Sequence, residues 1–278
     1  MLFLVEEFGK ELGKKKKKSN VLVGRSSHLL SKAMEDTERR NKNAHLKCFQ
    51  VDLSSFQSIL KFKGSFQQWL MDSDLHSSVQ LLINNAGILA TTFRLTAEGY
   101  DQMMGTNYIG AFSLTKVLLP LLENSPVPAR IVNVTSFTHR SVSDIQVDKE
   151  TVSGKSFLKF KKYPCAHIYE YSKLCLLLFS YELHRHYKLG DSLMSGYYCL
   201  LGLLQSPENG VRSILDAALA PPEISGVYFF GGNGRTVNSS ALSYDTKLAK
   251  ELWDTSCDLF LELQLGLQGH FLLNICIL

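Results

Sequence analysis

The 278-residue sequence has few of the features that mark several large classes of protein. Its six cysteines form no C-x-x-C pair and no zinc-type spacing with histidine, which excludes a zinc finger and favours free thiols in a reducing compartment. It has only seven prolines, no linker rich in proline, glycine or serine, and no repeat of fixed period. We therefore expect one domain over residues 1–278, with residues 264–278 as an atypical tail.

A continuous basic face is also lacking. Much of the net charge of +4 comes from Lys14 to Lys18 and from the cluster Lys159, Lys161 and Lys162. A nucleic-acid-binding protein would spread its basic residues along one face, with aromatic residues between them. The two clusters instead favour a solvated helix end and a solvated loop, so we expect no nucleic-acid partner.

No long apolar run is free of interruptions. Met1 to Val5 is apolar, but it has no basic segment before it and meets Glu6 and Glu7 at once, unlike a signal peptide. Charged and polar side chains interrupt the apolar segment from Leu259 to Leu278, which falls short of a spanning helix. We expect a cytoplasmic protein without a transmembrane segment, and we leave association with a membrane surface open.

Short β-branched or apolar runs alternate with longer helical stretches along the chain. This alternation predicts an α/β fold with a Rossmann-like, doubly wound parallel sheet. The expected strands are Val21 to Val23, Leu46 to Val51, Val79 to Ile83, Arg130 to Val134 and Val227 to Phe230. The expected helices are Leu29 to Arg40, Phe56 to Met71, Glu98 to Leu122, Ile168 to Leu189, Ser206 to Ala220 and Tyr244 to about Leu261.

Three motifs follow one another in a fixed order. Asn84-Asn85-Ala86-Gly87 comes directly after an apolar strand, where small residues would let a cofactor approach the backbone. Ser136 ends another strand, and Tyr169 and Lys173 share one face of a helix because they are four residues apart. In this order the motifs resemble those of the short-chain dehydrogenase/reductase family, and the chain is most similar to its retinol-dehydrogenase-like branch.

The resemblance implies a catalytic group made of Asn107, Ser136, Tyr169 and Lys173. Tyr169 would exchange a proton with the substrate oxygen, Lys173 would supply the adjacent positive charge, and Ser136 would hold the substrate oxygen. Asn107 would support a water linked to Lys173. Plainer interpretations remain open: Asn107 as a polar helix residue, Ser136 as a strand-end cap and Tyr171 as the functional phenol, although Tyr171 lies on another helix face.

The resemblance also implies a nicotinamide dinucleotide. Arg25 stands after the strand at Val21 to Val23, where an NAD enzyme would have an acid, which favours NADP because arginine suits a 2′-phosphate. A solvated loop arginine is the alternative. Asp52 matches the family acid at the adenine edge. The remaining cofactor-binding residues that the resemblance implies are Asn84, Ala86, Gly87 and Lys173.

The sequence departs from the family in two places. No T-G-x-x-x-G-x-G turn precedes Val21, and the first strand is not recognisable unless Met1 to Val5 imitates it. The penultimate strand, which should end in Pro-Gly, is not recognisable between Gly190 and Leu201. We therefore expect an incomplete sheet with its two halves separated. The segment from Ser141 to Lys162 lengthens the chain between Ser136 and Tyr169 and predicts a surface loop near the substrate mouth.

Two functions follow from this pattern. The first is an NADP-dependent oxidoreductase acting on a small-molecule carbonyl or alcohol, such as a lipophilic retinal-like or steroid-like compound. The second is a catalytically inactive scaffold, or a truncated form, that acts as an interaction protein because it has lost the cofactor. Both are compatible with a homodimer.

Overall fold

The computed structural model describes residues 2–6, 19–73, 77–188, 194–201, 207–221 and 223–275. Seven described strands form one sheet in the order β3-β2-β1-β4-β5-β6-β7. The strands are β1 (Leu2–Glu6), β2 (Ser19–Gly24), β3 (Leu46–Gln50), β4 (Leu81–Asn84), β5 (Ala129–Ser136), β6 (Met194–Leu201) and β7 (Tyr228–Phe229). Apart from the pairs that include β1, all neighbouring strands are parallel, which confirms the predicted α/β class.

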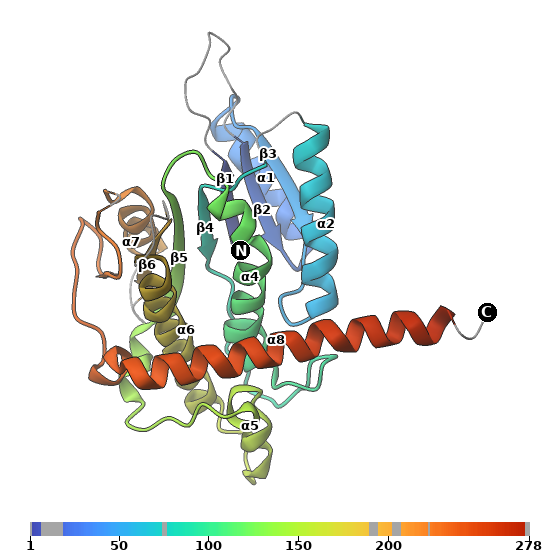
Figure 1. Cartoon of the computed structure of the whole chain (residues 1–278). Coiled ribbons are helices and arrows are strands. Elements are labelled where there is room, and N and C mark those ends of the chain that lie inside the picture. The colour runs from blue at the N-terminus through green and yellow to red at the C-terminus, as the bar shows by residue number, and fades with distance from the viewer. Residues whose placement is uncertain are drawn as a thin grey trace.

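Helices connect and cover the strands (Figure 1). The α-helices are α1 (Ser27–Arg40), α2 (Phe56–Asp72), α3 (Gln102–Met104), α4 (Gly110–Glu123), α5 (Lys149–Val152), α6 (Cys165–Lys188), α7 (Pro207–Leu219) and α8 (Thr246–Ile275). The shorter helical segments are η1 (Gly105–Ile109), η2 (Phe137–Ser141), η3 (Lys155–Lys159) and η4 (Ala241–Tyr244). Serine caps fix two helix starts, because Ser26 and Ser55 accept backbone N–H groups of α1 and α2.

The prediction that the sheet lacks its first strand was wrong. Strand β1 lies in the central position between β2 and β4 and is antiparallel to both, with Leu2 opposite Val23 and Glu6 opposite Ser19. An antiparallel neighbour needs no crossover connection, so a short apolar segment can fill this position and pair the backbone groups on both sides. The two halves of the sheet are therefore continuous.

The prediction that a penultimate strand is missing was also wrong. Strand β6 pairs with β5 in parallel over its whole length, from Met194 opposite Ala129 to Leu201 opposite Ser136. Its sequence contains two tyrosines and several other residues that suit a strand, and pairing with β5 does not require a Pro-Gly pair at the strand end. The sheet thus has a strand at every position that the family order requires.

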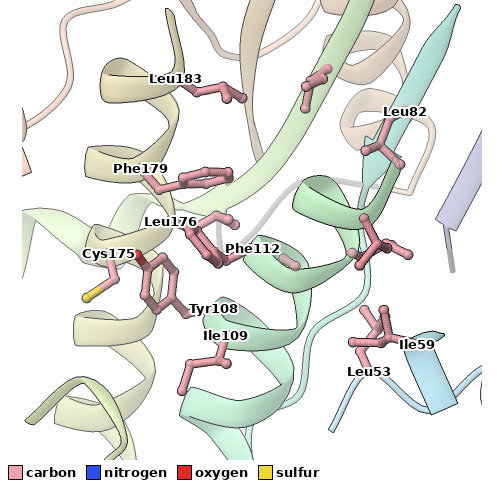
Figure 2. Close-up of a cluster of buried hydrophobic side chains, with 14 of the residues drawn as sticks. Leu53, Ile59, Leu82, Tyr108, Ile109, Phe112, Cys175, Leu176, Phe179 and Leu183 are labelled. Atoms are coloured by element: carbon pink, nitrogen blue, oxygen red, sulfur yellow. The ribbon is translucent and has the colours of Figure 1, made fainter. Parts of the chain in front are cut away.

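Alternate residues of the central strands pack on opposite faces of the sheet. Ile131 and Leu82 belong to the large core cluster that contains the buried side chains of α2, α4 and α6. Ile83 and Val132 face the other way and pack with Ala217 of α7. Figure 2 shows Tyr108, Phe112 and Phe179 where α4 and α6 meet, and the rings of Phe112 and Phe179 have centroids 5.1 Å apart. This alternation is typical of a sheet covered by helices on both sides.

Helix α8 crosses the outer surface of the helical layer and extends well beyond the predicted end near Leu261 (Figure 1). The ring of Trp253 stacks on Phe179 at 5.8 Å and meets Phe112 edge-on at 5.9 Å. The hydroxyl groups of Ser256 and Tyr108 are 2.6 Å apart. Residues 264–275, which were predicted to be an atypical tail, continue this helix. Across the described helices, none has the length and apolar character needed to cross a membrane.

Candidate active site

Three strands bring the sequence motifs to one edge of the sheet. Strands β2 and β4 are both antiparallel to β1 and so run in the same direction, and β5 is parallel to β4. Their carboxyl ends, at Gly24, Asn84 and Ser136, therefore lie at the same edge. Ligands of doubly wound sheets bind at this edge, so it is where a cofactor and a substrate should meet.

The first asparagine of the Asn-Asn-Ala-Gly motif ties the strands to the helices. Asn84 is buried, and its amide donates to Thr115 Oγ1 at 3.0 Å and to Asn133 Oδ1 at 2.8 Å. Asn133 in turn donates to Ser180 Oγ at 2.6 Å. The Asn84 side chain thus joins β4 to β5 and α4 directly, and to α6 through Asn133. The sequence prediction placed Asn84 at the cofactor itself.

Asn107 lies in η1, a π-helical segment within the long helix that the sequence predicted as continuous from Glu98 to Leu122. The wider turn displaces the residues after it, and such segments are frequent at functional sites. The Asn107 amide donates to the Ile88 carbonyl at 2.9 Å and to Ser172 Oγ at 3.1 Å, while its oxygen accepts the Ile88 N–H at 2.8 Å. Asn107 therefore joins the segment after Gly87 to helix α6.

Lys173 is a buried cation at the centre of the group. Its Nζ donates to the Val134 carbonyl at 3.1 Å and lies 5.7 Å from the centroid of the Tyr169 ring. Burial lowers the pKa of Lys173 to about 8, because the ammonium group loses hydration. A Cβ atom at Gly87 would lie 3.2 Å from Lys173 Nζ and 3.4 Å from Asn107 Oδ1, so glycine gives the space that this arrangement requires.

Tyr169 and Ser136 lie close enough for the Ser136 hydroxyl to influence the Tyr169 phenol. Burial raises the pKa of the half-buried Tyr169 phenol, and the nearby Ser136 hydroxyl partly opposes that rise. Tyr171 occupies a different place: it is buried in the core and donates to the Gln146 carbonyl. The structure therefore places Tyr169, and not Tyr171, beside Lys173 and Ser136.

Two supporting residues were not found from the sequence. His139 is fully buried, and its Nδ1 donates to the Ser136 carbonyl at 2.6 Å while its Nε2 accepts the Ser240 N–H at 3.1 Å. Burial lowers the pKa of His139 to about 4, which keeps the imidazole neutral. Ser172 links Asn107 to α6, as given above. Ser172 could have been found because it stands inside the Tyr-x-x-x-Lys motif. His139 could not, because its contact with Ser240 joins residues far apart in the sequence.

Four of the six predicted cofactor-binding residues line a cavity of about 160 Å³, and the other two, Asn84 and Lys173, do not. Arg25, Asp52, Ala86 and Gly87 line it together with Thr106 and the adjoining backbone. The Asp52 carboxylate accepts the Ser54 N–H at 2.9 Å and the Ser54 hydroxyl at 2.7 Å. Arg25 is exposed, and its guanidinium forms no ion pair with the acidic side chains that the structure describes. This cavity is suited to the adenosine end of a dinucleotide, with a free cation at its edge.

The pyrophosphate part of a dinucleotide site does not fit in the same way. Because β1 is antiparallel, its carboxyl end at Glu6 lies opposite Ser19, at the edge away from the cavity. Family members hold the pyrophosphate at a helix amino end that directly follows a parallel first strand. In the described residues, β1 delivers neither a glycine turn nor a helix start to this edge. The described residues at the two ends of the site therefore suit a nicotinamide dinucleotide, whereas no described residue directly after β1 forms a pyrophosphate-binding turn.

Comparisons with known proteins agree with this fold and identify the family. A family model described as short chain dehydrogenase matches residues 6–144. Polyprenol dehydrogenase of Homo sapiens is 31% identical over 86% of this chain and 76% of that protein. Retinol dehydrogenase 12 of Mus musculus is 32% identical, with the same shares covered.

Solved structures show the same architecture. A crystal structure of an uncharacterised protein from Mycobacterium paratuberculosis is 25% identical, covering 86% of this chain and 83% of that one with a TM-score of 0.68. NADPH-bound carbonyl reductase from chicken fatty liver is 16% identical, covering 78% and 86%, with a TM-score of 0.54, and supports the fold alone. The chain belongs to the short-chain dehydrogenase family, and its relatives include retinol dehydrogenases.

Proposed function

We propose that this chain is an NADP(H)-dependent oxidoreductase that interconverts a lipophilic carbonyl compound and its alcohol, with a weakened hold on the cofactor. The observation that carries the proposal is the meeting of three groups at the carboxyl edge of the sheet. The Tyr169 phenol lies near Ser136 and beside the buried ammonium group of Lys173. A phenol needs such a cation to act as an acid or base near neutral pH.

Each residue has a separate task in this proposal. Ser136 holds the substrate oxygen, and Tyr169 donates a proton to that oxygen during reduction or removes it during oxidation. Lys173 stabilises the phenolate form of Tyr169 by its charge. Asn107 and Gly87 keep the chain around Lys173 in place. The nicotinamide, when bound, supplies or accepts the hydride.

The lipophilic substrate class rests on two further observations. The similar proteins named above are a polyprenol dehydrogenase and a retinol dehydrogenase, which their names associate with long apolar alcohols. Exposed apolar side chains also border the site, including Leu89 and Phe93 in the segment after Gly87. NADP rests on Arg25 at the cavity edge, since an arginine suits a 2′-phosphate and an acid would repel it.

The proposal is tested by measuring the oxidation of NADPH at millimolar concentration. Two aldehydes are compared as substrates, one lipophilic and one short and hydrophilic. The chain should reduce a long-chain or retinal-like aldehyde more efficiently than a short hydrophilic one. If NADPH is shown to bind and no aldehyde is reduced, the proposed activity is overturned. A second function, the non-catalytic scaffold, is favoured by the antiparallel β1, and complete absence of NADPH binding at every concentration would support it.

Cofactor preference gives a prediction about Arg25. Arg25→Asp should reduce the ratio of NADPH affinity to NADH affinity by roughly tenfold to a hundredfold, because a charge-assisted contact is lost and a repulsive charge is added. Fluorescence titration with both cofactors measures this ratio. Arg40→Asp, at the exposed far end of α1, is the matched control. Equal affinities for the two cofactors before any substitution would show that Arg25 only faces solvent.

The pH dependence of reduction should follow Lys173. Its pKa of about 8 means that the cation predominates below this pH and is lost above it, so the reduction rate should fall as pH rises through about 8. The folding stability should change in the opposite direction and rise with pH over the same range. The unfolded chain keeps the lysine proton up to its ordinary pKa of 10.5, so deprotonation of the folded form relieves the burial cost in that window.

Rates and unfolding temperatures measured together from about pH 7 to pH 9 separate these effects. A falling rate with an unchanged or rising unfolding temperature is the expected result. His139 does not interfere because its pKa of about 4 lies far below this range. A rate that stays constant across the window would remove Lys173 as the titrating group.

A further inference from the structure

Exposed apolar side chains gather on two segments that flank the candidate site. Leu158 and Phe160 are 47% and 57% exposed, and they lie in the segment 155–163 that leads into α6. Leu89 and Phe93 are 60% and 41% exposed in the segment 88–95, which follows Gly87. We call these two segments together the rim surface. Burying such side chains stabilises a protein, so their exposure requires an explanation.

Anchors inside segment 155–163 hold its exposed side chains outward. The buried ring of Phe157 packs edge-on against Tyr171 at 5.6 Å. Just before the segment, Gly154 has a φ of +81°, and a Cβ atom there would lie 2.4 Å from Asp101 Cβ. At its other end the Tyr163 hydroxyl donates to Asp101 Oδ2 at 2.7 Å. Leu158 and Phe160 project between these fixed points, so their exposure is built into the fold.

The second segment is fixed beside the first. The ring centroids of Phe93 and Tyr163 are 5.9 Å apart. Gln102 holds the segment through its side-chain amide, which donates to the Thr92 carbonyl at 2.6 Å, and through its backbone N–H, which donates to the Arg94 carbonyl at 3.0 Å. The two segments therefore form one continuous surface.

Positive charge is interleaved with these apolar side chains. Lys155, Lys159, Lys161 and Lys162 are all exposed, and none forms an ion pair within the part of the chain that the structure describes. The segment 155–163 contains no acidic residue. The nearby Asp101 carboxylate is buried, and it caps α3 and accepts the Tyr163 hydroxyl. The rim surface therefore combines apolar groups with exposed lysines that form no ion pair with the described acidic side chains.

We propose that the rim surface docks the protein onto a membrane that contains anionic lipids. Leu158 and Phe160 would enter the boundary between headgroups and acyl chains, and the lysines would bind the headgroups while their stems lie along the apolar layer. From the sequence alone, this lysine cluster is expected to be a solvated loop. The membrane-docking interpretation replaces it because fixed, exposed apolar side chains lie between the lysines.

The shape of the surface favours docking to a membrane over docking into a groove of a partner protein. The part of the chain around α5 projects at the lower end of the view in Figure 1, and a projecting tip can enter a fluid headgroup layer without a matching partner shape. Tyr169 follows one turn after the start of α6, so the docked surface would lie at the mouth of the site. Entry of a lipophilic substrate from the bilayer rests on the proposed function, whereas the docking does not.

Sedimentation of the full chain with lipid vesicles tests the proposal. The chain should bind vesicles of phosphatidylcholine with phosphatidylserine, and bind weakly to pure phosphatidylcholine or in high salt. Replacing three lysines, in K159Q/K161Q/K162Q, should lower partitioning about tenfold or more, as should L158S/F160S. Matched controls are L215S/L219S, which changes exposed apolar residues of α7, and K32Q/K42Q/K250Q, which changes exposed lysines elsewhere. The controls should leave partitioning unchanged.

Several results would overturn the proposal. These are no binding to anionic vesicles, an equal loss of binding in the control variants, or binding that the rim variants leave intact. Vesicle-free self-association that L158S/F160S abolishes would assign the surface to a second copy of the chain instead. Because vesicle binding requires neither cofactor nor turnover, its failure leaves the proposed oxidoreductase activity standing, and loss of that activity leaves the docking result standing.

Discussion

Tyr169→Phe is expected to lower the rate of carbonyl reduction by about a hundredfold to ten-thousandfold, the range that a general acid or base contributes. The substitution removes only the hydroxyl group, which exchanges a proton with the substrate oxygen in the proposed reaction. The ring stays in place beside Lys173, so cofactor affinity and the unfolding temperature should change little. Single-turnover reduction at saturating NADPH measures the chemical step directly.

Tyr171→Phe is the control for this substitution. Its hydroxyl donates to the Gln146 carbonyl in the core, away from Ser136, so its loss should cost about 0.5–1.5 kcal/mol of folding free energy and leave the chemical step intact. Comparable turnover in the Tyr169→Phe protein would remove Tyr169 from the reaction. A larger rate loss in the Tyr171 variant would transfer the role to that residue.

The second large effect is expected from adding a glycine turn of the family type ahead of Glu6, to bind the pyrophosphate of NADPH. Replacing Met1 to Val5 with a strand and a T-G-x-x-x-G-x-G turn, so that the family-matched chain from Glu6 onward follows the turn, should raise NADPH affinity a hundredfold or more. The new strand would have to run parallel to β2 and β4, which brings its carboxyl end to the cavity. Backbone N–H groups of the turn would then face the pyrophosphate.

Fluorescence titration of both chains with NADPH measures this gain. The unchanged chain should bind NADPH only weakly and show no reduction at micromolar cofactor. A graft with its glycines replaced by alanine is the matched control, because it adds the same strand without the close backbone approach that glycine permits. If the unchanged chain binds NADPH at micromolar affinity, then β1 in its antiparallel direction does not impair the site.

Elements with a strong local signal were predicted well from the sequence. Helix α2 was expected from Phe56 to Met71 and runs over Phe56–Asp72, because its buried side chains recur at helical spacing behind the Ser55 cap. The motif that carries Ser136, Tyr169 and Lys173 was also recognisable, since each residue sits in a short sequence pattern. Their roles in catalysis remain a prediction that the experiments above test.

Features that depend on distant contacts were not predictable in the same way. The direction of β1 depends on pairing Phe3 with Ile83, and no property of the segment Leu2–Glu6 specifies that direction. The π-helical turn at Asn107 was missed because the hydrophobic pattern continues through it. Strand β6 was not predicted because its sequence lacks the Pro-Gly pair that ends this strand in the family, whereas pairing with β5 establishes the strand.

The position of α8 has a consequence for how the protein is made. This helix is the last described element to leave the ribosome, yet Trp253 covers Phe112 and Phe179, and Ser256 meets Tyr108 immediately beside Asn107 in η1. A nascent chain that has already formed its sheet therefore still exposes an aromatic surface behind the candidate site. Until α8 has been synthesised, that surface is open to chaperones and to other unfinished chains, which favours aggregation.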